Sequence, residues 1–295
     1  RGGRPGGAPG HKTVRFSFDA RDALRPAVRL SPDGRFLAFN QAYSEENGIF
    51  IRALASLEAR LLPSTDRSGG FFWSPDGREL AAILAGRLAA VDVGTGVSRT
   101  IATLPEVSTR GGTWNREGVI LVSLGGAIHR VSAAGGSLAP VLAPEKDRSS
   151  WHGHPLFLPD GKRFLVTSEV REGGENLLVV QVAELAAPAS ARVVLKRGLL
   201  VGLAGGHLVY ATPEGRLEVV PVDPDRLEPV GEPRVLAQQV SYDTRTGFVA
   251  ASAVEGALAY RLGRDPQSEF VWMDGSGRRL GRLGEPGPWH NFDLS

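Results

Sequence analysis

The side chains best placed for metal chemistry are His152 and His154, on either side of Gly153. Two imidazoles two residues apart on a strand share one face and are able to bind one metal ion. No third ligand lies nearby, and Pro155 follows at once. We therefore interpret the pair as structural or loop histidines.

A second group of possible ligands is acidic. Asp223, Asp225 and Glu228 gather around Pro224. They resemble a calcium loop only loosely, because the glycine and the regular ligand spacing of an EF-hand are absent. A strand-ending turn with proline explains the segment without an ion, so we expect no metal and no cofactor.

Motifs for covalent or nucleotide chemistry are missing from the sequence. It contains no Gly-x-Ser-x-Gly elbow, no His-Glu-x-x-His and no cysteine, so there is no disulfide, thiolate metal site or cysteine nucleophile. Gly94-Thr95-Gly96 continues as Val-Ser-Arg, which favours a turn between strands over a dinucleotide loop. These absences favour a non-catalytic protein.

A repeated turn organises the chain. It occurs as Ser31-Pro32-Asp33-Gly34, Ser74-Pro75-Asp76-Gly77 and Leu158-Pro159-Asp160-Gly161, with a degenerate copy at Asn115–Gly118. The glycines are spaced by 43, 41 and 43 residues, and weaker copies place glycines at 206 and 256. Proline presets φ and glycine accepts a left-handed conformation, so each copy predicts a tight turn between antiparallel strands.

Each repeat contains four apolar runs of strand length. In the second repeat they are Phe71–Ser74, Glu79–Leu84, Arg87–Val93 and Ser98–Ala102, and in the fifth they are Leu199–Ala204, His207–Ala211, Arg216–Val222 and Arg234–Val240. A four-stranded unit of about 40–45 residues is typical of a β-propeller. Trp73 and Trp114 precede equivalent turns, and we expect both to pack between blades.

The fold prediction is therefore an all-β propeller of four-stranded antiparallel blades, about six complete blades plus the start of another. We expect a flexible linker over 1–12 and a propeller over 13–295, with blades near 26–69, 70–110, 111–152, 153–198, 199–244 and 245–287 and a partial repeat over 288–295. The sixth blade would take its fourth strand from Arg278–Leu283. Val14–Asp19 alternates like a strand, and it would latch the ring by completing the blade that begins at Trp289.

Basic residues recur in the loops that enter the first strand of each repeat. These positions hold Arg25, Arg67, Arg110, His152, Lys196 with Arg197, Arg245 and His290. The seven four-residue windows contain six Lys or Arg and one acidic residue, Asp66, where the composition predicts about three of each. First strands line a propeller's channel, so we predict a basic ring at one channel mouth that binds an anionic ligand or an acidic protein. Exposed loops in an Arg-rich protein would also be basic without such a function.

Composition limits the function classes. The 295 residues carry 34 basic and 32 acidic side chains, a net charge of +2, which argues against a nucleic-acid partner. No apolar stretch approaches the ~20 residues of a membrane span. A membrane would be reached only through a missing upstream segment.

The pattern Ser-Pro-Asp-Gly-Arg-x-apolar-Ala-Phe, seen at Ser31–Phe39, resembles the TolB-type propeller repeat. Five stretches are similar to the C-terminal propeller region of bacterial eukaryotic-like serine/threonine kinases: Trp73–Gly77, Gly111–Ile120, Pro155–Arg163, Val222–Leu227 and Gly256–Arg261. In that family a kinase domain and a membrane-spanning helix precede the propeller.

The resemblance implies a sensor module outside the cytoplasm, on the periplasmic side of the inner membrane, with Arg1–Gly10 as its linker. Two alternatives stay open. One is a free TolB-like periplasmic scaffold protein. The other is the propeller of a prolyl-oligopeptidase-like hydrolase, which would require a Gly-x-Ser-x-Gly elbow beyond Ser295.

Overall fold

The computed structural model describes residues 27–41, 48–56, 58–66, 68–105, 108–145, 149–243, 248–263, 268–273 and 278–287. The expected linker over 1–12, the strand Val14–Asp19 and the partial repeat over 288–295 lie outside these residues. The described residues form strands and turns only. No described segment is a helix with the length and hydropathy of a membrane span.

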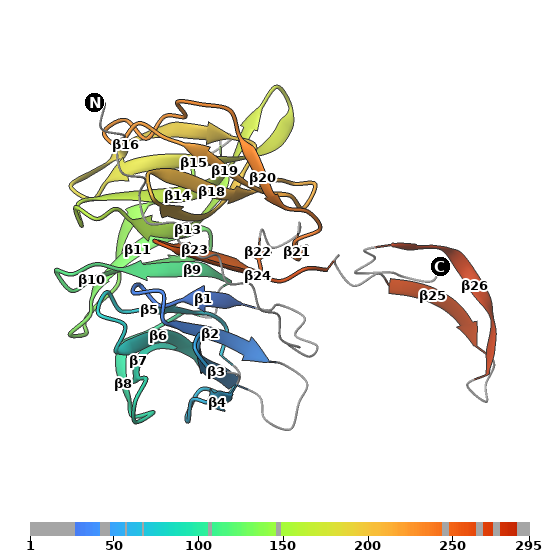
Figure 1. Ribbon diagram of the computed structural model, residues 1–295, viewed down its shortest axis with the longest axis horizontal. Helices are drawn as coiled ribbons and strands as arrows, with labels where there is room; N and C mark the ends of the chain where they lie inside the picture. Colours follow the sequence, from blue (N-terminus) through green and yellow to red (C-terminus); the bar gives the residue numbers. More distant parts are fainter. Residues whose placement is uncertain are drawn as a thin grey trace, which may run out of the picture.

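Five four-stranded antiparallel sheets form the body of the molecule, each with its strands in chain order (Figure 1). The first contains β1 (Val28–Leu30), β2 (Phe36–Gln41), β3 (Gly48–Ala53) and β4 (Ala59–Leu61). The second contains β5 (Phe71–Trp73), β6 (Glu79–Leu84), β7 (Arg87–Asp92) and β8 (Ser98–Thr103). The third contains β9 (Thr109–Trp114), β10 (Val119–Leu124), β11 (Ala127–Ser132) and β12 (Ala139–Leu142).

The fourth sheet contains β13 (Ser149–Phe157), β14 (Arg163–Glu172), β15 (Glu175–Glu184) and β16 (Ala187–Lys196). The fifth contains β17 (Leu199–Ala204), β18 (His207–Ala211), β19 (Leu217–Pro221) and β20 (Arg234–Ala237). Three two-stranded pairs follow: β21 (Tyr242–Asp243) with β22 (Phe248–Val249), β23 (Ala251–Val254) with β24 (Ala257–Tyr260), and β25 (Ser268–Met273) with β26 (Arg279–Gly287).

The ring closes through the first strand of each repeat. In cyclic order β1, β5, β9, β13, β17 and β23 each contact the next, and β23 returns to β1. Each four-stranded sheet has two apolar faces, and packing against neighbours on both sides buries them. The molecule is therefore a propeller with six inner strands around one axis.

The core is divided into clusters that lie between neighbouring blades. Trp73 packs with Leu80 of its own blade and with Ala27 and Ile49 of the first blade. Trp114 packs against the cluster between the second and third blades. Both tryptophans confirm the expected packing between blades.

The strands of the second and fifth repeats lie where the sequence predicts them, within a few residues at each end. The starts of the third and fourth blades differ from the prediction, since β9 begins at Thr109 instead of 111 and β13 begins at Ser149 instead of 153. In both cases the inner strand extends back through the loop that was expected to precede it.

Within the described residues, the prediction of six complete blades is corrected to five complete blades and a partial sixth. β24 pairs with β23 alone, and the expected fourth strand of this blade lies in β26, which pairs with β25 instead. Figure 1 shows this hairpin set apart from the ring. The physical reason lies directly after β24, where Leu262 bridges Val240 and the Gly263 amide donates to the Gln239 carbonyl at 2.9 Å. These contacts with the segment after β20 lead the chain away from the turn that would return it along β24.

Candidate functional site

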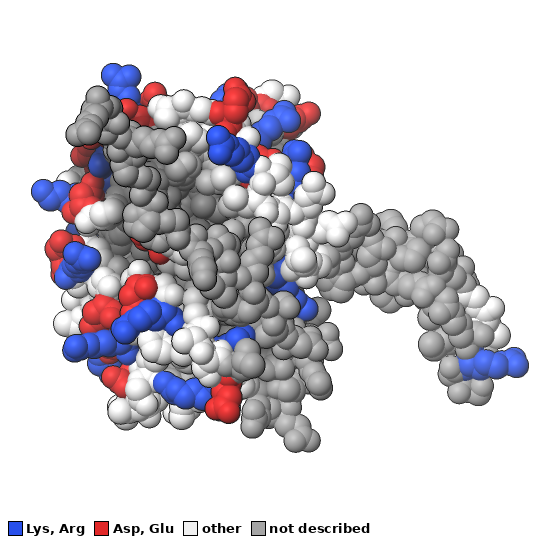
Figure 2. All heavy atoms as spheres, viewed as in Figure 1, with Lys and Arg blue, Asp and Glu red and all other residues white. Residues whose placement is uncertain are grey.

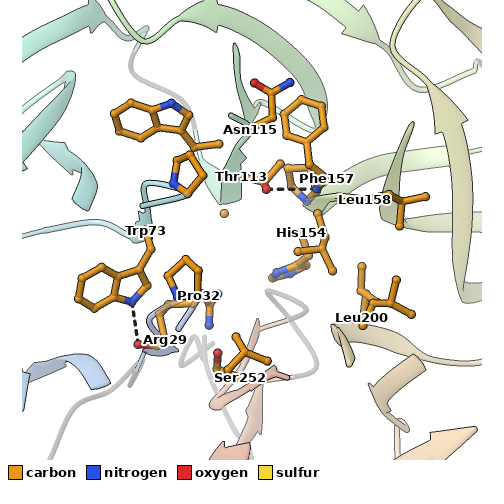
Figure 3. A pocket seen from close by; sticks show the side chains of 18 of the residues that line it. Arg29, Pro32, Trp73, Thr113, Asn115, His154, Phe157, Leu158, Leu200 and Ser252 are labelled. Atoms are coloured by element: carbon orange, nitrogen blue, oxygen red, sulfur yellow. Dashed lines mark hydrogen bonds between the residues drawn. The ribbon is translucent and has the colours of Figure 1, made fainter. Parts of the chain in front are cut away.

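A cavity of about 440 Å³ occupies the central channel (Figure 3). All six inner strands contribute to its lining, and so do residues of the turns that follow them, including Pro32, Pro75 and Pro159. The cavity therefore lies toward the channel end at which the inner strands finish. Its volume is within the range of small-molecule sites.

Arg29 brings a positive charge into this cavity from the middle of β1. Its Nη1 donates to the Val28 carbonyl at 2.8 Å and approaches the Ala251 carbonyl at 3.4 Å. The guanidinium carbon lies 6.0 Å from the centre of the Phe248 ring. Burial lowers the pKa of Arg29 to about 10, so the side chain stays charged at neutral pH.

His154 reaches the cavity because the backbone of β13 is irregular. The register of β13 against β14 shifts between Gly153 and Leu156, and His154 has a left-handed φ of 52°. Such bulges redirect side chains and occur often beside functional sites. The imidazole points into the cavity (Figure 3), with Trp151 edge-on at 6.5 Å between ring centres.

Several other polar side chains of the channel join neighbouring blades. The Leu30 amide donates to Ser252 Oγ at 3.0 Å, and Trp73 Nε1 donates to the Arg29 carbonyl at 3.0 Å. The Phe157 amide donates to Thr113 Oγ1 at 3.2 Å, a bond that Figure 3 also shows. These bonds satisfy inner-strand backbone groups that a polar cavity would otherwise leave unpaired.

Four of the eight residues in the predicted basic ring are described, and none of the four, Arg110, His152, Lys196 and Arg197, lines the cavity. Arg110 stacks on Trp151 at 4.6 Å from the ring centre, and burial lowers its pKa while nearby Glu169 opposes the shift. Arg197 is exposed, just before β17. All four residues precede the middle of an inner strand, whereas the cavity lies toward the end of these strands.

His152 is buried, unlike a residue of an exposed ring, with 4% of its surface accessible. Its Nδ1 lies 2.6 Å from Ser168 Oγ, and Ser168 donates onward to Gln181 Oε1 at 2.9 Å. Burial lowers the pKa of His152, while the Ala143 backbone and Glu145 oppose the shift. Arg25, Arg67, Arg245 and His290 lie outside the described residues, so the ring as a whole stays a prediction.

In the described part of the chain, no cluster of three or more His, Cys, Asp or Glu side chains could hold a metal ion. His152 and His154 lie in different surroundings because the bulge interrupts the alternation of β13. Asp223 accepts hydrogen bonds from the amides of Asp225 at 3.0 Å and Arg226 at 2.7 Å. Its carboxylate thus stabilises a turn.

Arg29 is not among the site residues predicted above, although its position in the repeat distinguishes it. Arg29 stands two residues before the Ser of its turn, where the next three repeats have Phe72, Thr113 and Leu156. A charged residue at an inner-strand position that is uncharged in these repeats is the pattern that would have identified it.

Charge on the visible outer surface does not indicate a different site. On the face shown in Figure 2, the described Lys and Arg side chains alternate with Asp and Glu. The exposed ion pairs of the described residues include Arg99 with Glu79 at 3.0 Å and Arg192 with Glu228 at 3.3 Å. Exposed pairs of this kind contribute little to stability or binding.

Comparisons with known proteins agree with this architecture. No family model matches the chain, and no curated protein matches it in sequence. Among solved structures, TolB from Acinetobacter baumannii superposes with a TM-score of 0.52 at 19% identity, over 66% of this chain and 51% of TolB. This chain thus spans about half the length of that TolB.

Two further solved structures extend the comparison. A chain of a nidogen/laminin complex has a TM-score of 0.57 at 11% identity, over 81% of this chain and 86% of its own. An oligogalacturonate lyase from Vibrio parahaemolyticus has a TM-score of 0.51 at 14% identity, over 74% of this chain and 68% of its own. At such identities the likeness concerns the fold alone, and propellers host many functions. By its fold, this chain is a β-propeller.

Proposed function

We propose that this chain is a non-catalytic recognition module that binds a ligand or a protein partner at the mouth of its central channel. The observation that carries the proposal is the cavity of about 440 Å³ at the junction of six inner strands. Apolar walls with a few convergent polar groups are typical of ligand sites. Trp73, Phe157 and Leu200 supply such walls, and Arg29 and His154 supply polar groups.

The proposed cellular context comes from the sequence. Trp73–Gly77 and Gly111–Ile120 resemble the propeller region of membrane-anchored bacterial serine/threonine kinases. We therefore propose that the module is the extracytoplasmic sensor of such a kinase. Reading the open reading frame on both sides of the chain tests this context. A kinase domain with a membrane span upstream supports it, whereas a signal peptide upstream or a hydrolase domain downstream would replace it with a periplasmic scaffold or a hydrolase propeller.

Binding at the channel is tested with a cavity-filling variant. Val201 lines the cavity from β17, so Val201→Trp should occupy the space that a ligand needs. Val193→Trp is the matched control, because Val193 is 41% exposed on the outer strand β16. Each protein is screened by thermal unfolding against sugars, amino acids, amines, carboxylic acids and phosphate esters.

We expect a binding compound to stabilise the unmodified protein and Val193→Trp but not Val201→Trp. At about 100 times its Kd a ligand contributes about 2.7 kcal/mol, which raises the Tm of a protein of this size by several degrees. A compound that stabilises all three proteins equally binds outside the channel. If every hit behaves in that way, the proposed site is wrong.

A further inference from the structure

Arg29 is a half-buried cation without an anionic partner in the described part of the chain. No Asp or Glu oxygen there lies within 4.0 Å of its guanidinium, in contrast to Arg35 with Asp33 or Arg163 with Asp160. Removing a cation from water is costly unless it is paired and hydrogen-bonded. Burial also lowers the pKa of Arg29, which is the direction expected when desolvation has no nearby negative charge to offset it.

The guanidinium is held in one orientation by protein contacts on one side. Nη1 donates hydrogen bonds to the carbonyl oxygens of Val28 and Ala251, and the Phe248 ring lies beside the guanidinium carbon. Nε and Nη2 make no hydrogen bond among the described residues, and neither is enclosed by protein. This edge of the guanidinium presents two parallel N–H donors, the arrangement that matches two oxygens of a carboxylate or phosphate.

We infer that Arg29 is the anion-binding residue of the channel and that it holds a carboxylate or phosphate group of the ligand through Nε and Nη2. This inference rests on the proposed function, because it names the chemical class of the ligand that the cavity takes. The remainder of that ligand is apolar or aromatic, since the walls around the charge include Trp73, Trp114 and Phe157.

The other charged residues at the cavity are compatible with an anion. Arg116 and Glu117 line it from the turn after β9, so basic side chains outnumber acidic ones. The Glu117 carboxylate lies close to Gly161, since a Cβ built on that glycine would be 2.4 Å from Oε2. Glu117 therefore belongs to the rim formed by the turns, and Arg29 lies deeper, on its strand.

The test titrates two probes, succinate and inorganic phosphate, at constant ionic strength against four proteins. These are the unmodified chain, Arg29→Met, Arg29→Lys and Arg192→Met. Arg192 is the matched control because it lies on the outer strand β16 and pairs with Glu228. Succinate and phosphate separate a carboxylate ligand from a phosphate ligand.

We expect at least one probe to bind, and Arg29→Met to lose about tenfold or more in affinity, since charge-assisted hydrogen bonds contribute that much each. Arg29→Lys should bind with intermediate affinity, because an ammonium keeps the charge but lacks the paired donors. Arg192→Met should bind like the unmodified chain. In the unmodified chain, the Nε–H resonance of Arg29 should shift during the titration, a readout that requires no variant.

Other outcomes overturn the inference. If both anions bind Arg29→Met as well as the unmodified chain, the anion site lies elsewhere. If neither anion binds but a neutral compound of the screen binds in the channel, the inference fails while the proposed function stands. If no compound binds in the channel, the proposed function fails as well.

Discussion

At the scale of single residues, backbone conformation separates side chains with a local role from those with a role in the channel. His154 and Arg197 both have left-handed φ values, 52° and 61°. A side chain in this region costs roughly 1–2 kcal/mol, so such conformations persist where surrounding structure requires them. His154 is directed into the cavity, whereas Arg197 is an exposed turn residue.

The Arg197 turn gives a prediction with a matched pair of variants. Arg197→Gly and Arg197→Ala both remove the charge, but only glycine accepts a φ of 61° without strain. We expect the glycine variant to be more stable than the alanine variant by about 1 kcal/mol, measured by urea unfolding. Equal stabilities would show that this backbone is unstrained. Neither variant should change anion binding, because Arg197 does not line the cavity.

At the scale of elements, the repeated turn is a hydrogen-bonded unit that each copy forms by itself. Ser31 Oγ donates to Asp33 Oδ1 at 2.6 Å and accepts from the Phe36 amide at 2.9 Å. Ser74 and Asp76 repeat the first bond at 2.7 Å. The bond from Ser31 lowers the pKa of Asp33 to about 2, and the bond from Ser74 likewise lowers the pKa of Asp76.

These two carboxylates predict how stability depends on pH. An unfolded Asp has a pKa of about 3.9, and both folded pKa values are lower, so the stabilisation is present above about pH 4 and is lost as pH falls toward 2. The double variant Asp33→Asn/Asp76→Asn should lose less stability between about pH 5 and pH 2. Its slope of unfolding free energy against pH should correspond to the uptake of up to about one proton fewer for each carboxylate removed. Urea unfolding across this range measures the slope.

Asp225→Asn is the control, since its carboxylate makes no hydrogen bond among the described residues. It should leave the acid slope close to that of the unmodified protein. An unchanged slope in the double variant would mean that other groups dominate acid unfolding.

At the scale of the whole molecule, ring closure depends on the contact of β17 with β23, because the described residues of the sixth blade form only these two paired strands, β23 and β24. Gly202 makes this contact possible: a Cβ there would lie 2.5 Å from the Ala253 carbonyl oxygen, a backbone atom that has little room to move. The same strand β23 packs against β1 on its other side. Two strands of the sixth blade thus join the first and last complete blades.

Gly202→Ala should therefore destabilise the protein by about 1–3 kcal/mol, as overpacking usually does. Gly70→Ala is the matched control, since its Cβ would meet only Ile83 Cδ1 at 3.9 Å, and we expect a change within about 0.5 kcal/mol. Urea unfolding of both variants measures the difference. Similar losses for both glycines would contradict a special role of the β17–β23 contact.

Several features of this protein were determined by the sequence alone. The turn at Ser74–Gly77 and the apolar run in Glu79–Leu84 predicted a hairpin that the structure contains as β5 and β6. Such elements are specified by neighbouring residues, through the conformations of proline and glycine and through short apolar runs of strand length. Their recurrence predicted the propeller, because a repeated four-stranded unit buries both faces only between copies of itself.

Only the tertiary structure decided where the repeats meet. Arg29 faces a cavity bordered by five other inner strands because the ring closes. His154 also lines this cavity because β13 has a bulge. The partial sixth blade likewise follows from the contact of Leu262 with Val240. These features arise from contacts between residues far apart in the chain, so a pattern read along one repeat contains no information about them.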